Sequence, residues 1–184
     1  MFYEITIAGL KRQLPLCKVT DDLYIGAFIM FGDVEITVTA AKALLAKAPD
    51  FDIMITAESK GIPLIHEMAR QAGVNDYVIA RKGPKLYMTN IIETEVDSIT
   101  TDHVQKLCIG QHEADLIRGK RVLIVDDVIS TGESLKSIET LVKQVGGNIV
   151  GRMTVLAEGA AADRADITYL AKLPVFHADG TVQP

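Results

Sequence analysis

Short apolar runs alternate with segments of helical periodicity through the middle of the chain. Four apolar runs predict buried strands, at residues 53–56, 77–80, 122–125 and 149–156. Around and between them, apolar residues recur at helical spacing and predict helices at residues 33–48, 62–71 and 135–145. Strands that alternate with helices are typical of an α/β fold, so we expect a mainly parallel central sheet flanked by helices.

The ends of these helices carry their own signals. Asp33 is placed to cap the first helix, and Pro49 follows its last residue. Gly73 follows the second helix and the pair Gly146-Gly147 follows the third. Glycine commonly ends a helix because it adopts a left-handed backbone conformation without a steric penalty, so we expect these helix boundaries in the structure.

Two regions break the alternation. The N-terminal stretch up to Gly32 could supply further strands or a small cap on the fold. Residues 83–119 hold few helix signals and many Thr, Asp and Glu residues. A segment of this length without a strong pattern is typical of an active-site lid. It also fits a simple two-stranded excursion, and both can hold in different parts of it.

Size and composition narrow the class of protein. A chain of 184 residues suits one domain with a sizeable core, which we place at about residues 33–158 of a single domain over 1–184. A net charge of −5 argues against non-specific nucleic-acid binding, which needs a basic face. The N-terminus lacks the basic start and apolar run of a secretion signal, and no apolar run has the length of a membrane span. The two cysteines and four scattered histidines fit neither a disulfide framework nor a zinc site, so we expect a cytoplasmic protein.

The strongest chemical signal lies at residues 122–135, where a buried strand ends in two carboxylates and a short polar turn opens an amphipathic helix. The carboxylates are Asp126 and Asp127; the segment after them, which we call the phosphate turn, contains Val128, Ile129, Ser130, Thr131, Gly132, Glu133 and Ser134. The N-terminus of a helix offers unpaired N–H groups and a positive dipole end, which suit a phosphate monoester. The two carboxylates suit sugar hydroxyls or a hydrated Mg²⁺. The alternatives are a plain strand–turn–helix with an acidic cap and a metal site of another nucleotide-binding family.

Two more segments follow strand ends. Residues 56–61, which we call the upstream turn, repeat the order of strand, small polar turn, glycine and helix, and contain Glu58, Ser59, Lys60 and Gly61. Residues 81–86, the basic segment, place Arg81, Lys82 and Lys85 directly after another strand. Backbone N–H groups and cations at such positions can bind a diphosphate. A plain helix cap by Ser59 and a solvated basic turn are the alternatives.

The phosphate turn resembles the motif that binds 5-phosphoribosyl 1-pyrophosphate (PRPP) in the type I phosphoribosyltransferases. The resemblance implies that Asp126 and Asp127 hold the ribose hydroxyls and that the following turn wraps the 5′-phosphate. Many members have a second glycine where this chain has Glu133. A carboxylate there would repel a phosphate, but at the first turn of a helix the side chain can point outward while its N–H still faces the ligand.

The upstream turn resembles the pyrophosphate loop of the same family, and the basic segment resembles a run found in its adenine, xanthine and orotate branches. The resemblance covers about residues 50–158, and it implies a small hood, built from the N-terminal segment and the C-terminal tail, and a flexible catalytic loop. It also implies a homodimer in which Arg81 reaches the pyrophosphate site of the partner, and Mg²⁺ that is carried by PRPP and meets Asp126 or Asp127 through water.

The implied reaction joins the phosphoribosyl group of PRPP to a purine base, in purine salvage. Asp127, Arg81 and an acid from the mobile loop are the expected catalytic residues, with Glu95 favoured and Glu93 as the second candidate. Adenine is the favoured base, and xanthine or another base is the alternative. A regulatory protein that binds PRPP or a nucleotide on the same fold is the alternative of a different class. The chain shows no winged helix and no basic patch that would serve such a regulator on DNA, so the enzyme is favoured.

Overall fold

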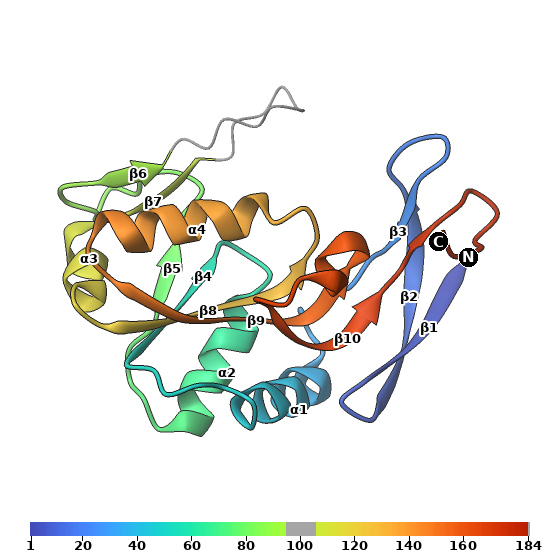
Figure 1. Cartoon of the computed structure of the whole chain (residues 1–184), viewed down its shortest axis with the longest axis horizontal. Helices are drawn as coiled ribbons and strands as arrows, with labels where there is room; N and C mark the ends of the chain where they lie inside the picture. The colour runs from blue at the N-terminus through green and yellow to red at the C-terminus, as the bar shows by residue number, and fades with distance from the viewer. Residues whose placement is uncertain (95–105, 184) are drawn as a thin grey trace.

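A five-stranded parallel sheet forms the centre of the molecule. The computed structural model describes residues 1–94 and 106–183. The strands of this sheet are β4 (Ile53–Ala57), β5 (Val78–Ala80), β8 (Arg121–Ile129), β9 (Asn148–Glu158) and β10 (Thr168–Leu173). They lie in the order β10-β9-β8-β4-β5, and every neighbouring pair is parallel (Figure 1). The predicted parallel α/β architecture is confirmed.

Helices cover both faces of this sheet, which explains why the central strands are mainly apolar. The helices are α1 (Val34–Leu45), α2 (Ile62–Ala72), α3 (Gln111–Ile117) and α4 (Glu133–Gln144). Leu123 and Val125 of β8 pack into the same core as α1 and α2. Their neighbours Val122 and Ile124 pack into a second core, which contains buried residues of α3 and α4. Since alternate residues of a strand face opposite sides, both faces of β8 are buried. None of the described helices is long and apolar enough to cross a membrane.

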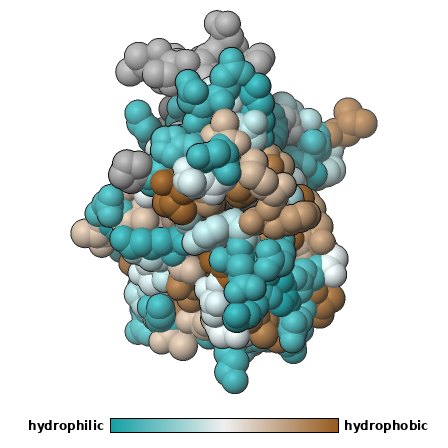
Figure 2. Space-filling view, turned by 90° about the vertical axis from the view of Figure 1, so that its right-hand side faces the viewer, coloured by the Kyte–Doolittle hydropathy of each residue, from teal (hydrophilic) through white to brown (hydrophobic). Residues whose placement is uncertain are grey.

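An antiparallel sheet lies beside this core, at the right of Figure 1. Its strands are β1 (Phe2–Ile7), β2 (Leu10–Lys18), β3 (Tyr24–Gly26) and β11 (Val175–Phe176), in the order β1-β2-β3-β11. Ile5, Ile7 and Leu14 join the core that also contains α1 and α2. Seen from the side of this sheet, patches of hydrophobic residues lie among hydrophilic ones (Figure 2). The alternative that the N-terminal stretch forms strands is confirmed.

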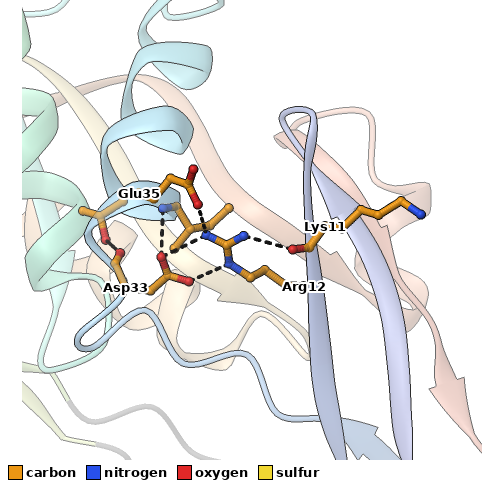
Figure 3. Close-up of polar contacts among 6 residues, drawn as sticks. Lys11, Arg12, Asp33 and Glu35 are labelled. Carbon is orange, nitrogen blue, oxygen red and sulfur yellow. Dashed lines mark hydrogen bonds and ion pairs between the residues drawn. The ribbon is translucent and has the colours of Figure 1, made fainter.

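Arg12 fastens this sheet to the first helix (Figure 3). Its guanidinium Nε donates to Asp33 Oδ2 at 2.6 Å, and its Nη2 donates to Asp33 Oδ1 at 3.1 Å and to Glu35 Oε2 at 2.8 Å. The same Asp33 accepts a hydrogen bond from the backbone N–H of Ile36 at 3.1 Å, which confirms Asp33 as the cap of α1. The hydrogen bonds from Arg12 are the main reason why the pKa of Asp33 is lowered.

Residues 83–119 contain more structure than their sequence pattern indicates. β6 (Ile92–Thr94) pairs antiparallel with β7 (Leu107–Ile109), so the two-stranded excursion is confirmed at both described ends. The part of the expected lid at residues 95–105 lies outside the described residues. Helix α3 follows directly and was not predicted. The backbone N–H of Gly110 at its start donates to Glu113 Oε2 at 3.0 Å, and this side-chain cap stabilises the short helix.

Candidate active site

Strand β8 does not end where the sequence predicted. The expected end was Val125, but the ladder with β9 continues through Asp126, paired with Thr154, as far as Ile129, paired with Ala157. The reason is the length of β9, whose eleven residues keep offering backbone partners after the apolar run of β8 has ended. Asp126 and Asp127 therefore point to opposite sides of a strand. Asp127 is buried, and Asp126 is partly exposed as a residue, although its carboxyl group is shielded from solvent.

One pocket unites the three segments that the sequence singled out. It has a volume of about 230 Å³ and lies where β4, β5 and β8 end. Its lining residues come from the upstream turn, the basic segment and β8 with the phosphate turn: Ala57, Glu58, Ser59, Lys60, Lys82, Asp126, Asp127, Val128 and Ser134. The carboxyl ends of parallel strands meet at one edge of a sheet, which is where ligands of open α/β folds bind.

A second, smaller pocket opens beside it. The phosphate turn encloses about 110 Å³, and the lining runs from Val128 to Leu135 with Asp126 added. Gly132 has φ +82°, a left-handed conformation that favours glycine, and it precedes the first residue of α4. Thr131 Oγ1 accepts a hydrogen bond from the backbone N–H of Glu133 at 3.5 Å. The two pockets share Asp126, Val128 and Ser134, so one extended ligand can occupy both.

A buried carboxylate oxygen in the larger pocket has no hydrogen-bond partner among the described residues. Asp127 Oδ2 lies 3.3 Å from Lys60 Nζ as an ion pair, but this contact lacks hydrogen-bond geometry, and no hydrogen bond to Oδ2 comes from the described residues. Burial, and secondly the charge of Asp127, raise the pKa of Asp126 well above its ordinary value. A buried carboxyl group is costly to ionise when no partner compensates its charge. The site therefore suits a ligand that supplies hydroxyl donors or a cation.

The upstream turn is packed closely against the same acids. A Cβ built at Gly61 would lie 2.3 Å from Thr56 Oγ1 and 3.2 Å from Asp126 Oδ1, so only glycine fits between β4 and β8 here. Thr56 is fully buried, and its hydroxyl also has no hydrogen-bond partner among the described residues. The peptide bond between Glu58 and Ser59 is cis. The sequence analysis did not identify Thr56, whose only signal is a polar residue at the end of an apolar strand.

Glu58 joins the upstream turn to the basic segment. Its Oε2 accepts a hydrogen bond from the backbone N–H of Lys82 at 3.1 Å and lies 3.6 Å from Arg81 Nε and 4.0 Å from Lys85 Nζ. The Lys82 N–H is the main cause of a lowered pKa of Glu58, and the nearby cations add to it. The sequence places Arg81 and Glu58 after different strands, and the structure brings them together because β4 and β5 are neighbours in the sheet.

The remaining candidates lie elsewhere. Arg81 and Lys85 contact Glu58 and do not line the pocket itself. Glu93 is exposed on β6, in register with Cys108 of β7. Glu95, the favoured acid of the mobile loop, lies outside the described residues. Sequence reasoning also missed Arg164, whose guanidinium approaches Gly132 from a distant part of the chain.

Comparison with known proteins agrees with this geometry. Residues 35–182 match the family model described as phosphoribosyl transferase domain. An adenine phosphoribosyltransferase of Acetivibrio thermocellus is 36% identical over 102 residues, which are 55% of this chain and 56% of the relative. That of Cenarchaeum symbiosum is 33% identical over 129 residues, which are 68% of this chain and 72% of the relative.

The match to the first of these relatives spans only about half of its length, at 56%. Similarity of fold extends further. The crystal structure of adenine phosphoribosyltransferase from Thermoanaerobacter pseudethanolicus has a TM-score of 0.66 and 23% sequence identity, over 94% of this chain and 95% of that one. The matched family model covers the whole central sheet and the complete candidate site, and the chain therefore belongs to the phosphoribosyl transferase domain family.

Proposed function

We propose that the protein is a purine phosphoribosyltransferase, which transfers the 5-phosphoribosyl group of PRPP to a purine base and releases pyrophosphate. The observation that carries this proposal is the pocket where the acids of β8 meet Lys60 of the upstream turn and Lys82 of the basic segment. PRPP combines a phosphate monoester, a diol and a diphosphate in one molecule. The two adjoining pockets offer a matching partner for each of these groups.

The phosphate monoester fits the smaller pocket. The N-terminus of a helix attracts anions through its backbone N–H groups and its dipole, and the hydroxyls of Ser130, Thr131 and Ser134 add donors near the start of α4. Asp126 and Asp127 would accept hydrogen bonds from the ribose hydroxyls, which would supply the partner that Asp127 Oδ2 lacks. The diphosphate would then meet Ser59, Lys60 and Gly61, with the basic segment behind them.

Magnesium fits this site as a companion of PRPP. Among the described residues, no group of three or more His, Cys, Asp or Glu side chains is placed to hold a metal ion. Two carboxylates beside a diphosphate are the usual setting for Mg²⁺, which keeps water molecules and binds phosphate oxygens. When bound, the ion would neutralise charge on the leaving diphosphate, while Asp126 or Asp127 would hold it through water.

In the reaction, a nitrogen of the base attacks C1′ of the ribose as the bond to pyrophosphate breaks. Positive charge develops on the ribose ring, as in glycoside cleavage. Asp127 would stabilise that charge, and Lys60, Lys82 and Arg81 would stabilise the negative charge on pyrophosphate. We also propose Glu95 as the residue that exchanges a proton with the base.

We favour adenine as the base, because relatives from several organisms are adenine phosphoribosyltransferases. The antiparallel sheet, with strands from both ends of the chain, is the proposed hood of a single domain. Its Cys17 and the buried Cys108 are both free thiols, which suits the reducing cytoplasm that we propose as the location.

We further propose a homodimer. Leu86 at the end of the basic segment, and Tyr87 and Ile91 after it, are exposed apolar side chains that a second copy would cover. Arg81 would serve the pyrophosphate site of the partner. For this it must exchange its contact with Glu58 of its own chain for the diphosphate.

Incubation with PRPP, Mg²⁺ and each of adenine, hypoxanthine, guanine, xanthine, uracil and orotate tests the proposal. Mass spectrometry of the products should find a nucleoside monophosphate with adenine. A nucleoside monophosphate formed with a different purine would change the assigned base and leave the assigned reaction unchanged. Tight binding of PRPP without product from any base would favour the regulatory protein on the same fold.

A further inference from the structure

A cation from outside all three predicted segments lies against the phosphate turn. Arg164 follows the short 3₁₀ helix η1 (Gly159–Asp163), which comes directly after β9. Its Nη1 lies 2.8 Å from the position that a Cβ at Gly132 would occupy. Position 132 requires glycine for two reasons. Its φ of +82° favours glycine, and any side chain there would displace the guanidinium.

The guanidinium is held in a fixed orientation. Arg164 Nε donates to Asp166 Oδ1 at 3.0 Å, and Nη2 donates to Asp166 Oδ2 at 2.8 Å. Such a two-pronged pair fixes the plane of the guanidinium, and here Nη1, which is not part of it, faces Gly132. Asp166 also lies 3.6 Å from Arg152 Nε, and Arg152 in turn donates to Glu139 of α4. Through this series of ion pairs, Arg164 is connected to α4, the helix that begins at the phosphate turn.

The phosphate turn lacks a positive charge of its own. Residues 130–134 contain no Lys or Arg, and Glu133 gives them a negative charge. Lys60 and Lys82 line the neighbouring pocket and not this one. A phosphate monoester carries about 1.5 to 2 negative charges at neutral pH. Arg164 lines a separate cavity of about 390 Å³ and not the smaller pocket itself; Thr131, Gly132 and Glu133 of the turn line both.

We propose that Arg164 is a further phosphate-binding residue of this site, and that its charge selects ligands whose monoester is a dianion. The inference rests on the proposed function, since it takes the phosphate turn as the place of the 5′-phosphate. The charge acts across Gly132, because the missing side chain there lets the guanidinium approach the backbone of the turn.

Calorimetric titration with ribose 5-phosphate and, separately, with Mg-pyrophosphate tests this. Arg164→Gln should weaken ribose 5-phosphate by about tenfold or more and leave pyrophosphate unchanged. Arg164→Lys should recover part of the loss because it restores the charge. The matched control is Arg118→Gln, which removes an exposed arginine that pairs with Asp115 three residues before it and should change neither affinity.

A pH series separates a charge effect from a structural one. The second pKa of a phosphate monoester is about 6, so wild-type affinity for ribose 5-phosphate should rise between about pH 5 and pH 7.5. That rise should be much smaller in Arg164→Gln. Equal losses for both ligands, or an unchanged pH profile in a folded variant, would overturn the proposal and leave Arg164 as a prop for η1. If wild type binds pyrophosphate but not ribose 5-phosphate, the site of the monoester is wrong. If it binds neither ligand, the proposed function itself fails.

Discussion

Lys60 Nζ lies 3.3 Å from Asp127 Oδ2, so a cation of the upstream turn neutralises a buried acid of β8. The two residues are 67 positions apart in sequence, and they meet because β4 and β8 are adjacent parallel strands. In the proposed complex each exchanges this contact for a ligand group, the lysine for the diphosphate and the acid for a ribose hydroxyl. Ligand binding therefore replaces one ion pair with a new ion pair and a hydrogen bond.

Asp127→Asn keeps the size of the side chain and removes its charge. We expect PRPP affinity to fall by at least about tenfold, or about 1.4 kcal/mol, because the amide is a weaker acceptor for hydroxyls and does not attract Mg²⁺. Calorimetric titration measures the change. Asp115→Asn on α3, an exposed acid that pairs with Arg118, is the control. Equal PRPP affinity in a folded Asp127→Asn variant would remove this residue from the site.

Asp126 should make the protein less stable as the pH rises. Its pKa is raised in the folded state, mainly by burial, so the folded protein binds a proton more tightly than the unfolded chain does. The free energy of unfolding then falls as the pH rises from the unfolded pKa, about 3.9, through the folded one. We expect Asp126→Asn to be more stable than wild type at neutral pH, with a difference that shrinks in acid.

Asp52 provides a control of opposite sign. Hydrogen bonds from Arg121 lower its pKa to about 2, so its contribution to stability is present above about pH 4 and is lost as the pH falls towards 2. Asp52→Asn should therefore be less stable than wild type at neutral pH and equal to it near pH 2. Thermal melts of both variants across the pH range decide the matter. Parallel curves for Asp126→Asn and wild type would contradict the cost assigned to the acid pair.

Gly61→Ala tests the close approach of the upstream turn. The added Cβ would lie 2.3 Å from Thr56 Oγ1, and overpacking of this kind costs about 1–3 kcal/mol. We expect a lower melting temperature and weaker pyrophosphate binding. The double variant Thr56→Ala/Gly61→Ala removes the clashing oxygen and should regain stability. If the single variant is as stable as wild type, the turn has more room than the structure shows.

The proposed dimer predicts complementation between two inactive variants. Arg81→Ala and Asp127→Asn are mixed and allowed to exchange subunits. If Arg81 serves the partner's site, one site of a mixed dimer collects both lesions and the other collects none, so activity should return to about a quarter of wild type after full exchange. A mixture that stays inactive, although mass spectrometry shows mixed dimers, would place the action of Arg81 in its own subunit.

The sequence revealed features that depend on local chemistry. Four of the five strands of the parallel sheet, the cap by Asp33 and the end of α2 at Gly73 each follow from a few neighbouring residues, and the structure confirms them, while β10 was not predicted. The upstream turn, the basic segment and the acids of β8 were found in the same way, and the structure brings them to one pocket.

Features that depend on a distant partner were missed. Strand β8 continues through its two acids because β9 pairs with it there, which the apolar pattern of β8 cannot show. Arg164 reaches Gly132 across 32 positions of sequence, and no spacing rule connects them. Helix α3 has seven residues, which is too short for a periodic pattern to stand out.

Release of pyrophosphate from PRPP is the most direct test of the central claim. The wild-type protein is incubated with PRPP and Mg²⁺, with and without adenine, beside the Asp127→Asn variant. The account predicts release that requires adenine, matches the amount of nucleotide formed and is strongly reduced in the variant. Release that is independent of any base, or none from a wild-type protein that binds PRPP across the whole panel of bases, would contradict it.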